Sequence, residues 1–183
     1  RLLAYSSLEH MGVIALGIGF AHPIAIAGVL LHVAGHAFAK ALGFYAATPL
    51  LHHQPSAARR LPTGLARTSP ATAGAVGLSL ASLAGLPPSP LFFSELFVLL
   101  GGVYAHQLWA VAIAGALLAL GFLGLAHALV EGLAGHARSG PAPASRPILA
   151  LTVVLGTALA GLAAAALFLP GSTIVDAVAR WAT

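Results

Sequence analysis

The stretch HVAGHAFAKALGFYAA, residues 32–47, decides the fold, because it places two histidines and the only lysine of the chain inside an apolar run. His32, His36 and Lys40 follow one another at steps of four, and each step turns an α-helix by about 400°. The three side chains therefore share one stripe, about 80° wide and about 12 Å long. Ionisable groups cost roughly 3 kcal/mol each inside a bilayer, so they usually face a bundle interior or a water-filled cavity. The stretch predicts a helix that lies inside a membrane bundle.

The whole chain has the composition of an integral membrane protein. Of its 183 residues, 59% are hydrophobic and 7% are charged, and its mean hydropathy is +0.96. A soluble domain carries about 25% charged residues, so this chain could not cover a water-facing surface. The absence of cysteine excludes disulfides, iron–sulfur clusters and thiolate metal sites in this chain. The arginines lie in short linkers between apolar runs, which is typical of topology control and argues against nucleic-acid binding.

Apolar runs of about 20 residues or more predict membrane-spanning helices. We expect an all-α, polytopic transmembrane bundle of about five spans, one of them a broken helix. A linker rich in Pro, Ser and Arg, which we expect to break any helix, follows the second span, and another follows the fourth. Residues 1–170 are expected to form the bundle, and residues 171–183 an interfacial tail. The predicted spans cover about residues 4–21, 24–51, 71–103, 107–133 and 148–169.

The third of these regions is interrupted by GLPPSP, residues 85–90, and could cross the membrane once or twice. Each half is shorter than the roughly 20 residues that a span needs, but both together, at about 50 Å, are too long for one straight span. One crossing puts six of the seven arginines on one membrane face, whereas two crossings split them five to two. The positive-inside rule favours a single crossing of two half-helices, with Arg1 and both linkers cytoplasmic. Unwound backbone at membrane depth marks ion sites in transporters, and a proline kink without function is the alternative.

The stripe in residues 32–47 is best interpreted as part of a proton path. Histidine can pass a proton between its two nitrogens, and Lys40 lies about 11 residues from the linker, too deep to reach the interface easily. The inert alternative has both histidines bonded to backbone carbonyls and Lys40 reaching to the interface. A second alternative is zinc, which binds His-x-x-x-His on a helix, but HVAGH lacks a third ligand and the glutamate of zinc proteases. We therefore predict no metal.

Other ionisable residues extend the candidate path. Glu95, in LFFSELFVLL, is the only charge of the third region, and we expect it to be coupled to Lys40 directly or through water. Glu9 and His10, in AYSSLEHMG, form either a proton-uptake site or a plain interfacial pair.

His127 and Glu131, four residues apart near the end of the fourth span, are likewise either members of the relay or a structural pair.

Three segments together resemble one family. RLLAYSSLEHMG, HVAGHAFAKALGFYAA and SLAGLPPSPLFFSELFVLL look like the second half of the proton-conducting, antiporter-like membrane subunits. That family occurs in respiratory complex I, in multisubunit (Mrp-type) sodium/proton antiporters and in energy-converting hydrogenases. The form Ser-Ser-x-Glu-His-Met-Gly is most similar to the F-type membrane component of hydrogenase-4. The resemblance covers about residues 1–100.

The resemblance implies a helix bundle of two inverted repeats, with a broken helix in each repeat and a row of buried lysines, histidines and a glutamate at the membrane midplane. It matches His36 and Lys40 to the family's His-x-x-x-Lys motif, and Glu95 to the charged group after the broken helix. Pro90 stands where the family often has glycine. The first repeat is absent, so we expect this sequence to be a piece of a longer chain that does not pump alone.

The predicted function is that of a proton-translocating, non-redox membrane subunit of a redox-driven complex of NADH:quinone oxidoreductase or hydrogenase type, with no cofactor of its own. The implied partners are other membrane and peripheral subunits, the lipid bilayer, and protons or sodium ions. The implied location is the bacterial plasma membrane, with several passes. An Mrp-type cation/proton antiporter subunit and an inert membrane scaffold are the alternatives.

Overall fold

All regular elements that the structure describes are helices. The computed structural model describes residues 2–53, 63–135 and 146–168, together with Asp176 and Arg180. The predicted all-α fold is confirmed, whereas the predicted tail at residues 171–183 lies almost entirely outside the described residues. The helices are α1 (Leu2–Gly19), α2 (Pro23–His53), α3 (Leu65–Thr68), α4 (Pro70–Leu83), α5 (Pro90–Tyr104), α6 (Leu108–Ala134) and α7 (Arg146–Phe168).

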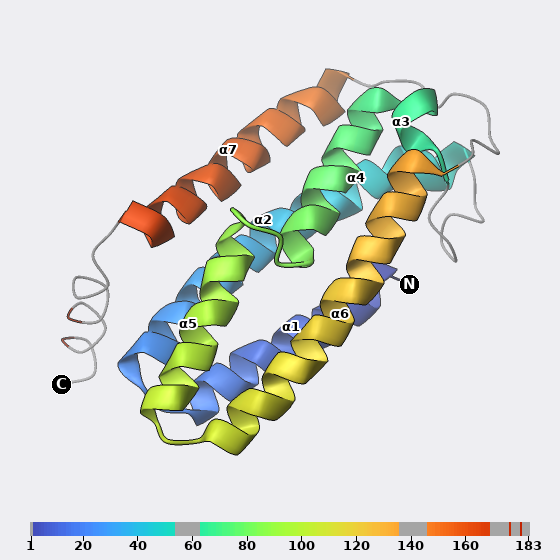
Figure 1. The fold of residues 1–183 in the computed structure, drawn as a ribbon. Helices are drawn as coiled ribbons and strands as arrows, with labels where there is room; N and C mark the ends of the chain where they lie inside the picture. Colours follow the sequence, from blue (N-terminus) through green and yellow to red (C-terminus); the bar gives the residue numbers. More distant parts are fainter. Residues whose placement is uncertain (1, 54–62, 136–145, 169–175, 177–179, 181–183) are drawn as a thin grey trace.

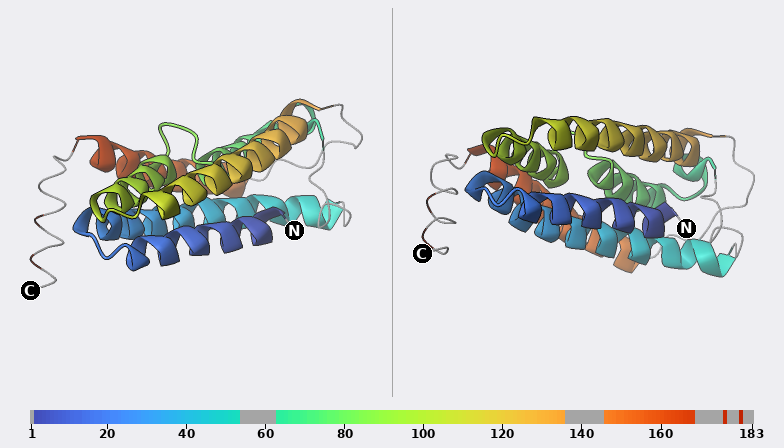
Figure 2. Two further views of the ribbon diagram at one scale, coloured as in Figure 1. Left: turned by 60° about the horizontal axis from the view of Figure 1, so that its bottom comes forward. Right: turned by 90° about the horizontal axis from the view of Figure 1, so that it is seen from below.

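Four of these helices, α1, α2, α6 and α7, are long and apolar enough to cross a membrane, and α4 and α5 are shorter apolar helices. Figures 1 and 2 show α4 and α5 end to end, running in the same direction along the bundle. This arrangement agrees with the single crossing of two half-helices that the arginine distribution predicts. The described bundle therefore consists of four helices long enough to span a membrane and one broken helix.

The first half-helix ends in a hydrogen-bonded turn that glycine makes possible. Gly85 has a φ of 67°, in the left-handed region that favours glycine. Its N–H donates to the Ser82 carbonyl at 3.1 Å, and the Leu86 N–H donates to the Ala81 carbonyl at 3.0 Å. These two hydrogen bonds satisfy two of the carbonyl groups that a helix end leaves without a partner, so helix α4 can end inside the bundle.

The second half-helix begins at Pro90, which we had expected to lie in the break itself. The Ser89 hydroxyl accepts a hydrogen bond from the Phe92 N–H at 3.2 Å and caps the helix. Proline suits the first helical position because the N–H that it lacks has no partner there in any helix. The non-helical segment is therefore residues 84–89.

The linker at residues 52–70 is more helical than predicted. Helix α2 continues to His53, α3 forms one turn after Gly64, and α4 already begins at Pro70. The expectation that its composition breaks any helix is wrong at its C-terminal end, because Pro70 at the first position of α4 supports that helix.

Helix α2 is the centre of the bundle. It contacts α1, α4, α5 and α7, while α6 lies against α1, α4 and α5 (Figure 1). The α2–α5 contact is close because Gly28 has no side chain: a Cβ atom there would lie 2.8 Å from the Ser94 carbonyl oxygen. Such close approach at small residues is typical of helix packing in membranes. It brings the start of α5 against the histidine stripe of α2.

Candidate functional site

Lys40 is held inside the bundle by α1. Its residue is 6% exposed, and its ammonium donates hydrogen bonds to the Leu3 carbonyl and, at 2.6 Å, to the Ser6 hydroxyl. The Phe44 ring centroid lies 6.0 Å from Nζ. The amine is therefore turned into the bundle and is held by the first turns of α1.

Three histidines from two helices meet beside this lysine. His10 of α1 places Nδ1 3.0 Å from Nε2 of His32, and both side chains are buried. The His10 ring centroid lies 4.6 Å from that of His36, and the His32 and His36 rings stack with centroids 6.3 Å apart. His32, His36 and Lys40 thus share one face of α2, as predicted, and α1 supplies the residues that meet it.

The hydrogen bonds of Ser94 indicate which nitrogen of His32, and through it of His10, carries the proton. Its hydroxyl lies 2.7 Å from the Leu91 carbonyl, which can only accept, so the single hydroxyl hydrogen points there. Ser94 Oγ must then accept from Nδ1–H of His32, 2.8 Å away. In the neutral ring Nε2 of His32 has a bare lone pair, which accepts from Nδ1–H of His10. By the same logic, Nε2 of His10 has a bare lone pair.

Two histidine nitrogens at this cluster are buried and have no hydrogen-bond partner among the described residues. They are Nε2 of His10 and Nδ1 of His36. The backbone of Leu83, at the end of the first half-helix, is close to the His10 ring but outside hydrogen-bond geometry for Nε2. A buried polar atom without a partner costs free energy, so both nitrogens would gain from a partner that the described residues do not supply.

Glu9, and not Glu95, is the carboxylate that interacts electrostatically with Lys40. Among the described residues no ion pair joins Lys40 to Glu95, so the direct pair that the sequence suggests is not formed. Glu9 interacts electrostatically with both Lys40 and Glu95. The Glu95 carboxylate lies next to Gly85, since a Cβ atom on Gly85 would be 2.8 Å from Oε2. Glu95 is thus seated beside the break in the helix.

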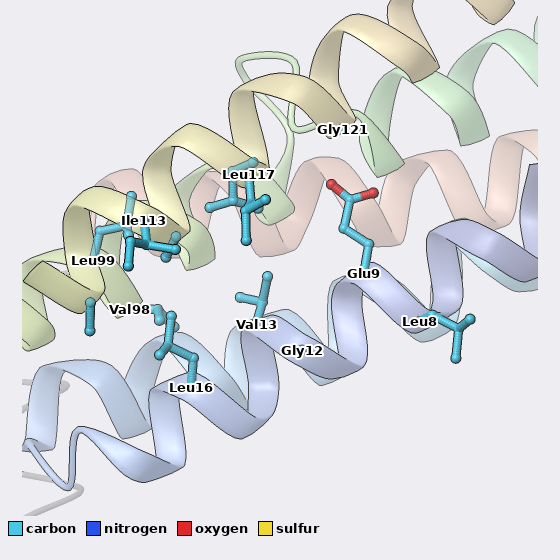
Figure 3. A pocket seen from close by; sticks show the side chains of 13 residues that line it. Leu8, Glu9, Gly12, Val13, Leu16, Val98, Leu99, Ile113, Leu117 and Gly121 are labelled. Atoms are coloured by element: carbon cyan, nitrogen blue, oxygen red, sulfur yellow. The ribbon is translucent and has the colours of Figure 1, made fainter.

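Figure 3 shows the Glu9 side chain leaving α1 and pointing toward α6 near Gly121. This carboxylate lines a pocket of about 410 Å³ between α1, α5 and α6. The other described residues around that pocket are apolar, among them Val13, Leu16 and Leu117. Glu9 is therefore a half-buried carboxylate that faces a largely apolar pocket, part of whose lining, such as Ile113 and Leu117, is exposed on the outside of the described helices.

The pair at the end of α6 has a different setting. Nε2 of His127 lies 3.8 Å from Oε2 of Glu131, and the two side chains are 81% and 36% exposed. These residues lie on the outer part of the bundle, and their membership of a relay stays a prediction.

Sequence reasoning missed Ser6 and Ser94, both of which are buried. Ser6 lies four residues before His10, so the helical spacing puts both on the face of α1 that meets α2. Ser94 precedes Glu95 directly and lies on a different side of α5. The first residue could have been found from its spacing, but the second needed the packing of α5 on α2.

The fold and site define a polytopic helical membrane protein that keeps a row of ionisable side chains inside its bundle, next to a broken helix. The chain belongs to the family described as NADH:quinone oxidoreductase/Mrp antiporter, TM, whose model matches residues 1–121. The predicted family resemblance is thereby confirmed.

Two relatives illustrate the range of this family. The chain is 36% identical over 115 residues to "NADH-quinone oxidoreductase subunit N" of Desulforudis audaxviator, which covers 62% of this chain and 23% of that protein. It is 33% identical over 144 residues to "Hydrogenase-4 component F homolog" of Methylacidiphilum infernorum, which covers 78% of this chain and 30% of that protein. The chain thus aligns with less than a third of either relative.

Among solved structures, the Mrp complex from Dietzia sp. DQ12-45-1b contains a chain with the same fold. The TM-score is 0.63 at 24% sequence identity, over 96% of this chain and 44% of that chain.

Proposed function

We propose that this chain is part of a proton-translocating membrane subunit of a redox-driven complex of NADH:quinone oxidoreductase or hydrogenase type. It has no redox centre of its own and works in a bacterial plasma membrane with other membrane and peripheral subunits. The observation that supports this most is the buried row of proton-bearing groups from Lys40 through the three histidines to Ser94, inside an otherwise apolar bundle.

The row gives each residue a distinct role. Lys40 is the central proton carrier, because it is the only lysine of the chain, is buried, and is held by α1 through two hydrogen bonds. His36 lies one helical turn before Lys40 in α2, and its ring packs against the His10 ring. Glu9 and Glu95 are the coupling groups, since a change of charge on Glu9 is felt by both Lys40 and Glu95.

The hydrogen bonds between the histidines allow a proton to pass. A proton that binds Nε2 of His10 makes this ring an imidazolium, which can release its Nδ1 proton to Nε2 of His32. His32 then carries a proton on each nitrogen, and its Nδ1–H stays hydrogen-bonded to Ser94 Oγ. This transfer covers one hydrogen bond, and the excess proton has moved from His10 to His32.

Lys40→Ala in the full-length protein within its complex tests this function. We expect proton translocation to be abolished, by about a hundredfold or more, because a proton carrier in the row is lost. Lys40→Met, which keeps an unbranched side chain of similar length, controls for the cavity that alanine leaves. Proton uptake into vesicles is measured with a pH-sensitive dye, and assembly on native gels. Unchanged translocation in assembled variants would favour the inert scaffold.

A cation/proton antiporter of Mrp type is the second candidate, because the family description covers both kinds of protein. The two are separated by sodium. Proton translocation by the redox-driven subunit is expected in sodium-free buffer with the electron donor present, whereas an antiporter needs an opposing cation gradient and no donor.

A further inference from the structure

The three histidines converge more closely than a proton relay requires. One side-chain nitrogen from each of His10, His32 and His36 can be chosen so that all three lie within 4.8 Å of one another. Three imidazole nitrogens at about 2.0–2.1 Å from a tetrahedral Zn²⁺ are separated by about 3.3 Å. The His10–His32 nitrogen separation of 3.0 Å is already near that value. Ring rotations that shorten the longest nitrogen separation, by at most about 1.5 Å, would complete the triangle.

The lone pairs of the cluster are available to an ion. Nδ1 of His36 is buried without a hydrogen-bond partner in the part of the chain that the structure describes. Nε2 of His10 has no partner there either, so the single proton of neutral His10 can move to Nε2 and leave the lone pair of Nδ1, 3.0 Å from Nε2 of His32, to the ion. Nε2 of His32 has the bare lone pair that the Ser94 hydrogen bond imposes. A metal-binding histidine usually donates its other N–H to a neighbouring acceptor, and Ser94 provides that acceptor for His32.

We propose that His10, His32 and His36 form a binding site for a divalent transition-metal ion of the Zn²⁺ class. Three neutral nitrogen donors favour Zn²⁺ or Cu²⁺ over Mg²⁺ or Ca²⁺, which prefer oxygen ligands. The fourth position is left for water. His36 is the partly exposed member and marks the side from which an ion enters. The sequence offered only two of these ligands, four residues apart, and the fold supplies the third from α1.

The charges that face the site act in opposite directions. Lys40, one turn after His36, opposes a divalent cation, and Glu9, in electrostatic range of Lys40, favours it. An ion at the site would occupy the lone pairs that the relay uses. The bound ion is therefore expected to inhibit proton translocation reversibly, and this expectation rests on the proposed function.

Binding is tested on the full-length protein in detergent, stripped of metal with a chelator and titrated with Zn²⁺ alone against a coloured competitor. His36→Gln should weaken binding by about a hundredfold or more. Ser94→Ala should weaken it by about 10- to 100-fold, as expected for loss of an outer hydrogen bond. His52→Gln is the matched control, because His52 is an exposed histidine near the end of the same helix, α2. Equal affinity in all four proteins would overturn the proposal.

Two further readouts separate the site from the proposed function. Electron paramagnetic resonance of bound Cu²⁺ should show three coordinated imidazole nitrogens, and fewer in His36→Gln; an unchanged spectrum in this variant overturns the site. Because His36 lies at the edge of the cluster, this variant remains informative if His10→Gln fails to fold. If Zn²⁺ binds with three nitrogens and translocation continues at full rate, the site stands and the proton path through the histidines fails.

Discussion

Helices α2 and α6 both carry ionisable side chains four residues apart, but in opposite surroundings. His32 of α2 is fully buried, whereas the His127 side chain of α6 is 81% exposed. Half of the spanning segment of α2 is buried, compared with 11% for α6, although α6 is the more apolar helix. In a bilayer the most apolar helix has no reason to avoid the lipid, while a helix with ionisable groups gains from protein neighbours. Spacing assigns residues to one face, and the neighbouring helices decide what that face meets.

The largest contrast between these two helices should come from the histidines themselves. His32→Gln is expected to lower proton translocation by about a hundredfold, because glutamine can form hydrogen bonds but cannot take up and release a proton on two sides. His127→Gln is expected to change it by less than about twofold. Both rates are measured in proteoliposomes with the full-length protein in its complex. An equal loss in both variants would place the α6 pair in the relay and remove the contrast.

A smaller effect is expected at the contact between α1 and α2. The hydroxyls of Ser6 and Ser7 both donate to the Leu3 carbonyl, at 3.2 and 3.1 Å, but only Ser6 also accepts from Lys40. Ser6→Ala removes one of the two partners of a buried ammonium, at a cost of about 1–3 kcal/mol. We expect translocation to fall about tenfold, which corresponds to about 1.36 kcal/mol.

Ser7→Ala is the control for this change, since it removes the same kind of bond within the same turn of α1. Its rate of translocation should stay near that of the unaltered protein. If both variants lose activity equally, the effect comes from the stability of α1, and the contact between Ser6 and Lys40 is not what matters.

Much of this arrangement could be predicted from the sequence because it depends on local patterns. The stripe of His32, His36 and Lys40 follows from helical periodicity, and the break follows from Gly85 and the prolines after it. The family could also be identified from three segments in order. These features need no knowledge of which helices are neighbours.

The partners of the stripe could not be predicted, because they come from residues far away in the chain. Lys40 is bonded to residues 37 and 34 positions before it, and His32 is bonded to one 62 positions after it. Periodicity says nothing about such pairs. Sequence reasoning therefore chose Glu95 as the partner of Lys40, while the packing of α1 on α2 supplies the Leu3 carbonyl and the Ser6 hydroxyl.

The smallest expected effect concerns the broken helix formed by α4 and α5, which packs against the buried helix α2. At Gly85 the left-handed φ of 67° costs a residue with a side chain about 1–2 kcal/mol. A Cβ atom there would also lie 2.8 Å from Oε2 of Glu95 and displace this carboxylate. Gly85→Ala should therefore lower the free energy of unfolding by about 1–2 kcal/mol, measured by denaturant unfolding of the full-length protein in detergent.

Gly74→Ala in α4 is the matched control. This glycine lies inside a helix, and a Cβ atom there would have nothing within 4 Å, so alanine should stabilise the helix by about 0.5–1 kcal/mol. The two substitutions add the same methyl group at two places in one broken span, and the expected changes have opposite signs. If Gly85→Ala were as harmless as Gly74→Ala, the turn would be free to adopt another backbone conformation, and Glu95 would owe its position to α5 alone.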